Sequence, residues 1–284
     1  MDILPIVRTV ADLRTQVSAW HRQGRTVALV PTMGALHAGH MALVERARTL
    51  ADHVVASVFV NPTQFAPHED FDRYPRDEAG DAAKLAAAGC DLLYAPSVAE
   101  MYPEGFCTAV SVGGPAEGLC GTFRPQMFGG VALVVTKLFL QAQPDVAVFG
   151  EKDYQQLQVI RRFARDLDIP VRVEGAPTVR EADGLAMSSR NAYLSADERA
   201  RAPELYRALS EAAEALASGA PAGLALERAS ARIAAAGFAR IDYVELRDAG
   251  TLAPVDHVTH PARLLAAAWM GKARLIDNVA VVPG

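Results

Sequence analysis

Short apolar runs alternate with segments of helical periodicity through the first two-thirds of the chain. Residues 27–30 and 54–60 are rich in valine and leucine and end at Pro31 and at Asn61, which predicts two buried strands. Between them, apolar residues from position 41 to 50 recur at helical spacing. This strand–helix–strand order predicts parallel βαβ topology, with ligands bound beyond the carboxyl ends of the strands.

The same alternation predicts the remaining elements of a Rossmann-like α/β domain. We expect a strand and a helix within residues 1–25 closed by Gly24, helices over 77–88, 129–141 and 154–167, and strands over 91–95, 145–149 and 171–177. The glycine-rich stretch 105–123 predicts an edge strand at 106–112 followed by a mobile loop. The charges of 68–76 predict a solvated loop.

From Ser195 onward alanine-rich segments replace this pattern. They predict helices over 195–218 and 223–236, followed by strands over 242–246, 263–269 and 274–279. Helices followed by strands are typical of a small α+β domain. We therefore expect two domains, a parallel-sheet domain over 1–184 and a smaller α+β domain over 185–284.

Composition and charge narrow the class of protein. The 284 residues are 51% hydrophobic and 21% charged, which is typical of a globular protein. A net charge of −5 offers no general attraction for nucleic acid or an anionic membrane, and no apolar segment is long enough to span a bilayer. No signal peptide is evident, and three widely spaced cysteines indicate reduced thiols in the cytoplasm.

The richest candidate chemistry lies in the sequence MGALHAGH, between the first predicted strand and its helix. His37 and His40 should stand at a helix N-terminus, which attracts anions, and Gly34 and Gly39 let the backbone approach a ligand. A metal site is an alternative, but no third ligand stands out, and surface histidines at a turn are another. We prefer a phosphate site, although neither the P-loop nor the dinucleotide fingerprint is present.

Two further segments bring polar residues to predicted strand ends. Asn61 and Gln64 fall at the same edge as the histidines, although an ordinary Asn-Pro turn would explain Asn61 alone. Lys152 is a cation at the positive end of a predicted helix, which suggests an anionic partner. Asp153 and Gln156 also fit a helix N-cap pair.

The segment 180–191 places two serines beside an arginine. Hydroxyl donors next to a guanidinium suit a departing pyrophosphate, whereas the alternative is an ordinary linker between domains. His257 and His260 are isolated and predicted to lie on the surface. The pair Ser195 and Glu198 is predicted to cap a helix and to have no other role.

These motifs carry a family resemblance. MGALHAGH is similar to the HIGH-type signature of the nucleotidyltransferase superfamily, and together with FVNPTQF, FGEKDYQQ and MSSRN it closely resembles the pantoate–β-alanine ligase family. The match runs in unbroken order from about residue 25 to residue 199 and more loosely beyond. It implies ATP-dependent condensation of (R)-pantoate with β-alanine to pantothenate, through a pantoyl adenylate, with release of AMP and pyrophosphate.

The resemblance also implies roles for residues. It implies that His40, His37 and Lys152 are catalytic residues and that His40 is the proton donor. ATP binding is assigned to Met33, Gly34, His37, Gly39, His40, Gly150, Glu151, Lys152, Asp153, Val179, Met187, Ser188, Ser189 and Arg190. Pantoate and β-alanine are assigned to Gln64, Gln156 and Asn61. Mg²⁺ is expected with ATP, held by phosphates and water, with no protein metal ligand named, and a homodimer with a lid-like second domain is implied.

One position departs from the family. In FRPQMF, Met127 stands where the family more often has histidine. The loss of that imidazole could alter the rate or the substrate affinity. Arg124 is retained and is expected to act as a flexible cation. Three alternative functions remain. They are another adenylyltransferase of the superfamily, an aminoacyl-tRNA synthetase, and a nucleotide-binding regulator without catalysis. The net negative charge of the chain disfavours the synthetase.

Overall fold

The computed structural model describes residues 4–66 and 71–283, and the chain divides into two compact units. The first unit comprises the chain up to Val112 with Arg124–Glu151 and Val159–Pro177. The second comprises Gly113–Phe123, Lys152–Gln158 and the chain from Thr178 onward. The start of the polar loop predicted at 68–76 lies outside the described residues, and Phe71–Arg73 forms a 3-10 turn, η2.

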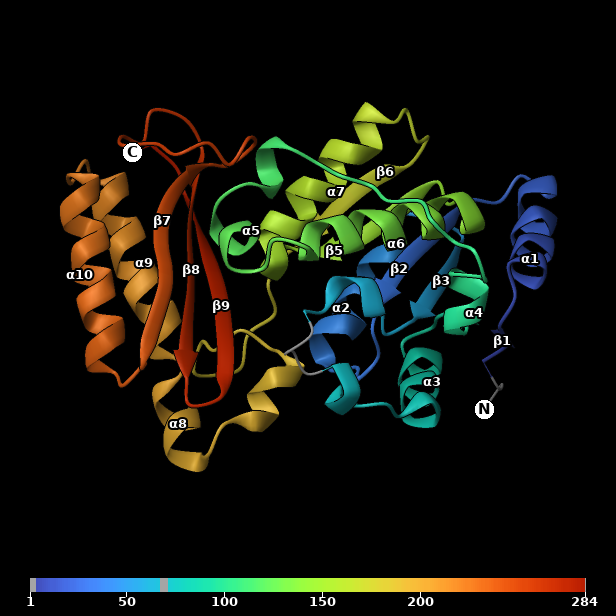
Figure 1. Cartoon of the computed structure of the whole chain (residues 1–284), viewed down its shortest axis with the longest axis horizontal. Coiled ribbons are helices and arrows are strands. Elements are labelled where there is room, and N and C mark those ends of the chain that lie inside the picture. Colours follow the sequence, from blue (N-terminus) through green and yellow to red (C-terminus); the bar gives the residue numbers. More distant parts are fainter. Residues whose placement is uncertain (1–3, 67–70, 284) are drawn as a thin grey trace. The chain divides into compact units, whose positions relative to one another are not determined.

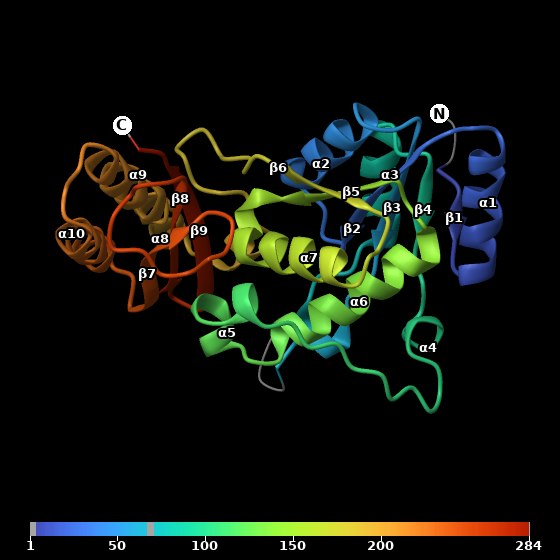
Figure 2. The ribbon, with the colours of Figure 1, turned by 90° about the horizontal axis from the view of Figure 1, so that it is seen from above.

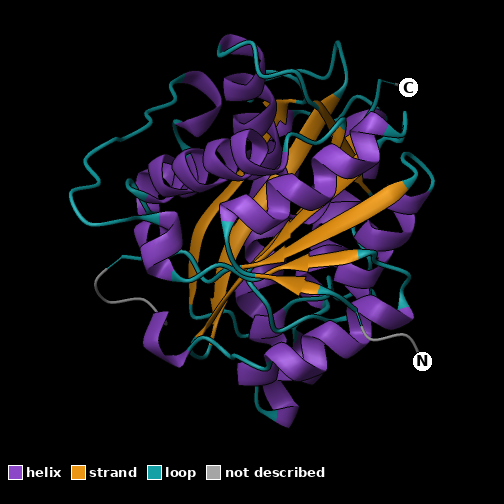
Figure 3. Cartoon of the chain, turned by 90° about the vertical axis from the view of Figure 1, so that its right-hand side faces the viewer, coloured by secondary structure: helices purple, strands orange, loops and turns teal. Residues whose placement is uncertain are grey.

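A six-stranded parallel sheet forms the centre of the first unit (Figure 3). Its strands are β1 (Ile6–Val7), β2 (Val27–Thr32), β3 (His53–Val58), β4 (Leu92–Tyr94), β5 (Val146–Gly150) and β6 (Arg172–Ala176). They lie in the order β1-β4-β3-β2-β5-β6, with β1 beside β4 at one edge (Figure 2). The predicted parallel topology is confirmed, and strands are present at six of the seven positions where the sequence predicted them in this domain.

The direction of chain progression reverses between β2 and β5. From β2 the chain moves outward through β3 and β4, and β5 then pairs with the other side of β2, with Ala28 opposite Val146. At such a reversal the connections leave a crevice beyond the carboxyl ends of the strands, where α/β proteins bind ligands. The segment MGALHAGH follows β2, and β5 ends at Gly150 and is followed by Glu151, so both segments lie at the carboxyl ends of the two strands that flank the reversal.

Helices cover both faces of the sheet. They are α1 (Val10–Arg22), α2 (Ala38–Arg48), α3 (Glu78–Ala87), α4 (Val98–Met101) and α6 (Met127–Ala142), together with α7 (Tyr154–Asp166), whose first turn belongs to the second unit. In β2, Ala28 and Val30 join the core beneath α2 and α3, while Leu29 is buried toward the opposite face. Burial on both faces explains why the strand has an unbroken apolar run.

Three details of this unit differ from the sequence prediction. Residues 106–112 are extended but form no strand: they run over α6, where the Lys137 ammonium lies 4.9 Å from the Phe106 ring centre, and β1 already pairs with the edge of β4. Strand β3 ends at Val58 rather than at residue 60. Leu167, predicted on the apolar face of α7, is exposed because that helix ends at Asp166.

The second unit is built on a three-stranded antiparallel sheet of β7 (Arg240–Asp248), β8 (Ala262–Met270) and β9 (Ala273–Val281). Helices α9 (Glu204–Ala217) and α10 (Ala222–Ala235) pack together on one face of it (Figure 1). Ala266 and Ala268 of β8 belong to the same hydrophobic core as α9 and α10, and their small side chains leave room for the helices to approach. The predicted α+β architecture is confirmed.

Short elements complete the second unit. They are η3 (Gly114–Ala116), α5 (Leu119–Phe123), η5 (Ser189–Tyr193) and α8 (Ala196–Arg201). The predicted cap is present, because Ser195 and Glu198 exchange side-chain and backbone hydrogen bonds at the start of α8. The long helix predicted over 195–218 is instead two helices, since Pro203 separates α8 from α9.

Among the described residues, no helix combines the length and apolar character needed to cross a bilayer. All three cysteines lie in the described part of the chain and are free thiols, with Cys107 exposed and Cys90 and Cys120 buried. His257 and His260 are exposed, as predicted.

Candidate active site

The turn after β2 has an unusual backbone. Gly34 has φ +81° and the next residue, Ala35, has φ +52°, a left-handed conformation that alanine rarely adopts. A side chain at Gly34 would bring its Cβ to 3.1 Å from Asp81 Oδ2 and 3.3 Å from Val58 Cγ1. Glycine is therefore required here by both conformation and space.

A buried carboxylate on α3 holds this turn. Asp81, 1% exposed, accepts from Ala35 N and from Leu36 N, each at 2.9 Å. Lys84 Nζ donates to Leu36 O at 2.9 Å and lies 3.5 Å from Asp81 Oδ1. Two charge-assisted hydrogen bonds to adjacent N–H groups offset the strain of the turn.

Sequence reasoning missed Asp81, although a signal was present. Asp81 lies four residues before the buried Leu85 and so shares the inward face of α3. An acidic residue on an apolar helix face requires donors in the folded protein.

The turn leads directly into α2, for which His37 is the N-cap residue and His40 lies in the first turn. Gly39 N donates to His37 Nδ1 at 3.1 Å, and His37 N donates to His40 Nδ1 at 3.3 Å. The ring centres are 4.1 Å apart. The predicted placement of both histidines at a helix N-terminus is confirmed.

These bonds fix the tautomer of both rings. A ring nitrogen that accepts from a backbone N–H carries no proton, so each neutral imidazole holds its proton on Nε2. Both Nε2 atoms are consequently hydrogen-bond donors. Donors at the positive end of a helix suit an anionic group such as a phosphate.

The segment after β3 adds amide groups beside this turn. Asn61 caps the 3-10 turn η1 (Pro62–Gln64), and Gln64 Nε2 lies 2.8 Å from Met33 Sδ. The loops after β2 and β3 therefore meet, as the parallel topology predicted. Asn61 is 1% exposed, and its side chain bonds to Gln64, Thr63, Tyr102 and Gly130.

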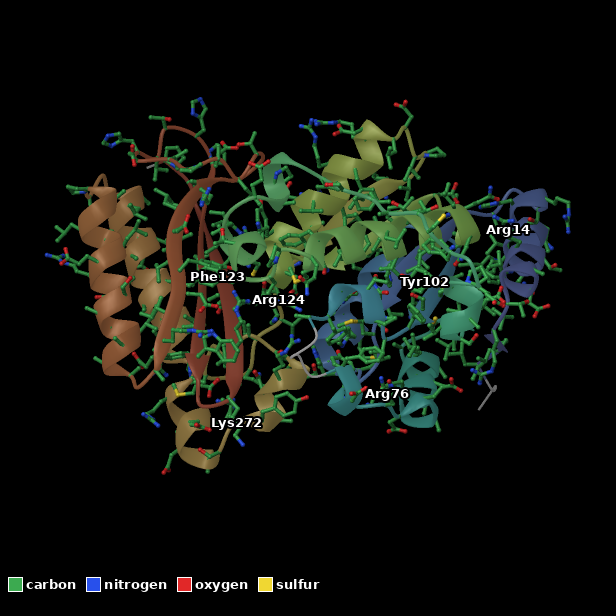
Figure 4. The ribbon with its side chains drawn as sticks, in the orientation of Figure 1. Arg14, Arg76, Tyr102, Phe123, Arg124 and Lys272 are labelled. Atoms are coloured by element: carbon green, nitrogen blue, oxygen red, sulfur yellow. The ribbon has the colours of Figure 1, made fainter. Side chains whose placement is uncertain are left out.

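Arg124 and Met127 lie near Gln64. Arg124 precedes α6 (Figure 4) and donates from Nη2 to Gln64 O at 3.4 Å, while its Nη1 contacts the sulfur of Met127, the first residue of α6. Met127 is 9% exposed. At the position where the family resemblance led us to expect histidine, this chain has a thioether, a weak acceptor, against the guanidinium.

In the second unit, Lys152 and Asp153 precede α7, which begins at Tyr154. Lys152 Nζ lies 3.8 Å from Asp153 Oδ2, its side chain is 20% exposed, and Asn278 Nδ2 donates to its carbonyl at 3.0 Å. Asp153 does not cap α7, contrary to the N-cap interpretation, because it is the last residue of the 3-10 turn η4 (Glu151–Asp153) that continues into the helix. Gln156 is partly exposed on the first turn of α7.

A hairpin-like loop gathers the other polar candidates of this unit. Met187 N donates to Val179 O at 3.0 Å, and Arg180 pairs with Ala186, which brings two segments of the loop together. Ser188 then caps η5, where its Oγ accepts from Arg190 N at 3.3 Å, and Ser189 begins that turn. An oxygen that accepts this bond keeps its own hydrogen for donation.

The loop is fixed to β9 by an ion pair that the sequence did not reveal. Arg180 donates from Nη1 to Asp277 Oδ2 at 2.6 Å and from Nη2 to Oδ1 at 2.9 Å. The guanidinium also lies 3.6 Å from the centre of the Tyr206 ring. Bidentate pairing and ring stacking together set the start of the loop.

Fold and site together define an α/β protein with donors for an anionic ligand at the carboxyl edge of its parallel sheet. The family model for pantoate–β-alanine ligase matches residues 5–280, and the chain belongs to that family. Its activity is accordingly the ATP-dependent condensation of pantoate with β-alanine.

Relatives and solved structures agree over nearly the full length. The chain is 64% identical over 278 residues to a pantothenate synthetase from Paramagnetospirillum magneticum, covering 98% of each chain, and 61% identical over 281 residues to one from Caulobacter vibrioides, covering 97% of this chain and 98% of the relative. The crystal structure of pantothenate synthetase from Thermus thermophilus matches with a TM-score of 0.93 at 52% identity, covering 99% of this chain and all of the other. The Francisella tularensis pantoate–β-alanine ligase, crystallised with β-γ ATP and β-alanine, matches with a TM-score of 0.82 at 31% identity, covering 97% of each.

Proposed function

We propose that this protein condenses (R)-pantoate with β-alanine in two steps through a pantoyl adenylate. In the first step a pantoate carboxylate oxygen attacks the α-phosphorus of ATP and pyrophosphate leaves. In the second, the neutral amine of β-alanine attacks the acyl carbon, AMP leaves, and the amine loses one proton. The observation that carries the proposal is the pair of Nε2 donors at the N-terminus of α2.

This chemistry fits the residues. A carboxylate is already ionised near pH 7, so the first step needs no general base and no covalent enzyme intermediate. It needs alignment and neutralisation of phosphate charge. We assign His40 as donor to a phosphate oxygen as charge develops, supported by His37 and by Lys152.

The nucleotide contacts are assigned from the family resemblance. The turn residues Met33 and Gly34 with Gly39 bind ATP at the start of α2. Gly150 and Asp153 bind the ribose, Lys152 the phosphates, and Ser188, Ser189 and Arg190 the departing pyrophosphate; Glu151, Val179 and Met187 complete the nucleotide site. Support comes from the family resemblance and, for the serine loop, from the bond that leaves Ser188 free to donate its hydrogen.

Pantoate and β-alanine are assigned to Gln64, and pantoate also to Gln156. An amide donates to a carboxylate and accepts from a hydroxyl without adding positive charge that would blunt the nucleophile. Asn61, which is buried and donates to Gln64 Oε1, is assigned to the same site.

Mg²⁺ is expected to accompany ATP. No group of three or more histidine, cysteine, aspartate or glutamate side chains gathers as metal ligands in the part of the chain that the structure describes. We assign the cation to the ATP phosphates and water, where it would neutralise phosphate charge. We further propose a cytoplasmic homodimer with a mobile second domain, for which light scattering after gel filtration tests the dimer.

The deciding experiment is pantoate-dependent exchange of labelled pyrophosphate into ATP. Exchange driven by pantoate without β-alanine supports the adenylate. Exchange driven by a different acid favours another adenylyltransferase, and nucleotide binding without exchange favours a regulator.

Substitutions test the acid site. Gln64→Ala and Gln156→Ala should each lose pantoate-dependent turnover while ATP binding persists, and the exposed Gln16→Ala on α1 is the matched control. Unchanged kinetics in both variants contradict the assignment.

A further inference from the structure

A chain of hydrogen bonds leads from Tyr102 to Gln64 within the first unit. Tyr102 Oη donates to Asn61 Oδ1 at 2.7 Å, and Asn61 Nδ2 donates to Gln64 Oε1 at 3.1 Å. The Tyr102 ring (Figure 4) packs against Phe59 and Phe106, with ring centres 6.1 and 5.2 Å away. Burial raises the pKa of Tyr102 above its ordinary value, so its hydroxyl keeps its proton and remains a donor.

The amide of Asn61 cannot be turned over. Thr63 N donates to Asn61 Oδ1 at 3.3 Å, and Gly130 O accepts from Asn61 Nδ2 at 3.1 Å. A backbone N–H only donates and a backbone carbonyl only accepts, so these two partners assign the oxygen and the nitrogen of the amide without ambiguity.

The orientation of Asn61 decides that of Gln64. Because Asn61 presents N–H to Gln64, it must meet the Gln64 carbonyl oxygen. The Gln64 NH₂ group then faces Met33, whose sulfur lies 2.8 Å away. A thioether is a weak acceptor, and an oxygen of a bound ligand would compete for these hydrogens successfully.

We propose that Tyr102 is a positioning residue that acts through Asn61 to hold the Gln64 amide with its NH₂ group toward the turn after β2. The subsite at Gln64 consequently presents N–H donors to an acceptor oxygen, a carboxylate or hydroxyl oxygen of the hydroxy acid. This inference rests on the proposed function, which supplies pantoate as the ligand. Loss of the Tyr102 hydroxyl removes one of the bonds that hold Asn61 in place.

The first test removes only that hydroxyl. Tyr102→Phe should raise the KM for pantoate about fivefold while kcat and the KM for ATP change less than twofold, since one neutral hydrogen bond of the support is lost. The matched control is Tyr94→Phe, which removes another buried hydroxyl of the same unit, one that donates to Gln141 Oε1 at 3.2 Å. Tyr94→Phe should leave both KM values unchanged.

The second test reverses the polarity of the subsite. Gln64→Glu replaces the NH₂ group with an oxygen and should lower kcat/KM for pantoate at least about fiftyfold, as the donor is exchanged for a charge that repels the acid. Asn61→Asp turns the donor toward Gln64 into an acceptor, so the Gln64 amide should rotate and kcat/KM should fall as far as in Gln64→Ala. Thermal unfolding of each variant identifies any that fail to fold, and Tyr102→Phe then still decides the matter.

The outcomes separate this inference from the proposed function. Wild-type protein without pantoate-dependent pyrophosphate exchange overturns the function. Normal wild-type exchange with equal pantoate KM values in Tyr102→Phe and Tyr94→Phe overturns the inference alone. A Gln64→Glu variant whose kcat/KM for pantoate stays within threefold of wild type also overturns the inference. A Tyr102→Phe variant whose KM values for ATP and pantoate rise together overturns it as well.

Discussion

Single buried polar atoms decide the geometry at the candidate site. Asp81 satisfies two backbone N–H groups of the strained turn, and Asn61 sets the direction of a neighbouring amide. Each is 1% exposed, so its partners cannot be replaced by water at little cost. Removing either leaves buried donors without acceptors, which is costlier than losing a surface contact.

Asp81→Ala should lower the free energy of unfolding by about 3 kcal/mol, because two N–H groups lose a charged acceptor. It should also reduce kcat, since the turn precedes His37. Urea denaturation measures the first effect and steady-state kinetics the second. The control is the exposed Asp72→Ala, expected to change stability by less than about 0.5 kcal/mol. Equal stability of the two variants would show that the carboxylate does not hold the turn.

A buried thiol should make stability depend on pH in the alkaline range. Burial raises the pKa of Cys90 from 9.0 to about 11. Above pH 9 the thiol ionises in the unfolded chain but stays neutral in the folded one. The contribution of the buried thiol to the free energy of unfolding is therefore complete below pH 9. Between pH 9 and 11 the free energy of unfolding falls by about 2 to 3 kcal/mol.

Unfolding free energies at pH 8 and 10.5 measure this effect. The pH dependence should be weaker in Cys90→Ala than in wild type, whereas the exposed Cys107→Ala should follow wild type. An identical pH dependence in all three proteins contradicts the burial argument.

At the scale of elements, the site depends on how closely α6 approaches η1. Gly130 of α6 lies against the backbone of Thr63, and a Cβ at this glycine would lie 2.6 Å from Gln64 N. The helices and strands were largely predictable from the sequence, because apolar periodicity and capping residues act between positions that are close in the chain. The contact between α6 and η1 was not, since it joins residues almost seventy positions apart.

Gly130→Ala should therefore displace η1. We expect a loss of about 1 to 3 kcal/mol of stability from overpacking and a raised KM for pantoate, measured by denaturation and kinetics. Gly223→Ala on α10 is the control, since nothing lies within 4 Å of a Cβ there, and alanine should be neutral or stabilising by up to about 1 kcal/mol. A stable Gly130→Ala variant with unchanged kinetics would contradict the close packing.

At the scale of the whole molecule, each unit has a separate hydrophobic core. Among the residues that the structure describes, the core beneath α2 and α3 shares no member with the core of α9, α10 and the antiparallel sheet. The two tryptophans divide in the same way, with Trp20 on α1 and Trp269 on β8. Fluorescence can thus follow each unit separately.

Asp277→Ala should destabilise the second unit by about 3 to 5 kcal/mol, since Arg180 keeps a charge that is mostly buried. The loss of stability should shift the unfolding transition seen by Trp269 fluorescence more than the one seen by Trp20 fluorescence. Trp269 is followed in a Trp20→Phe background, and Trp20 in a Trp269→Phe background. Exposed Asp256→Ala is the control. Equal shifts of both signals would show that the units unfold together.

The sequence determined the elements and their order, because apolar spacing, glycine and capping residues act within a few positions of the chain. It placed His37 and His40 at a helix start and brought Gln64 to the same sheet edge through parallel topology. Only the tertiary structure decided that 106–112 runs over α6 without pairing, that Asp81 holds the histidine turn, and that Tyr102 and Asn61 orient Gln64. Those outcomes depend on which donor meets which acceptor across long stretches of chain, and no local pattern encodes that pairing.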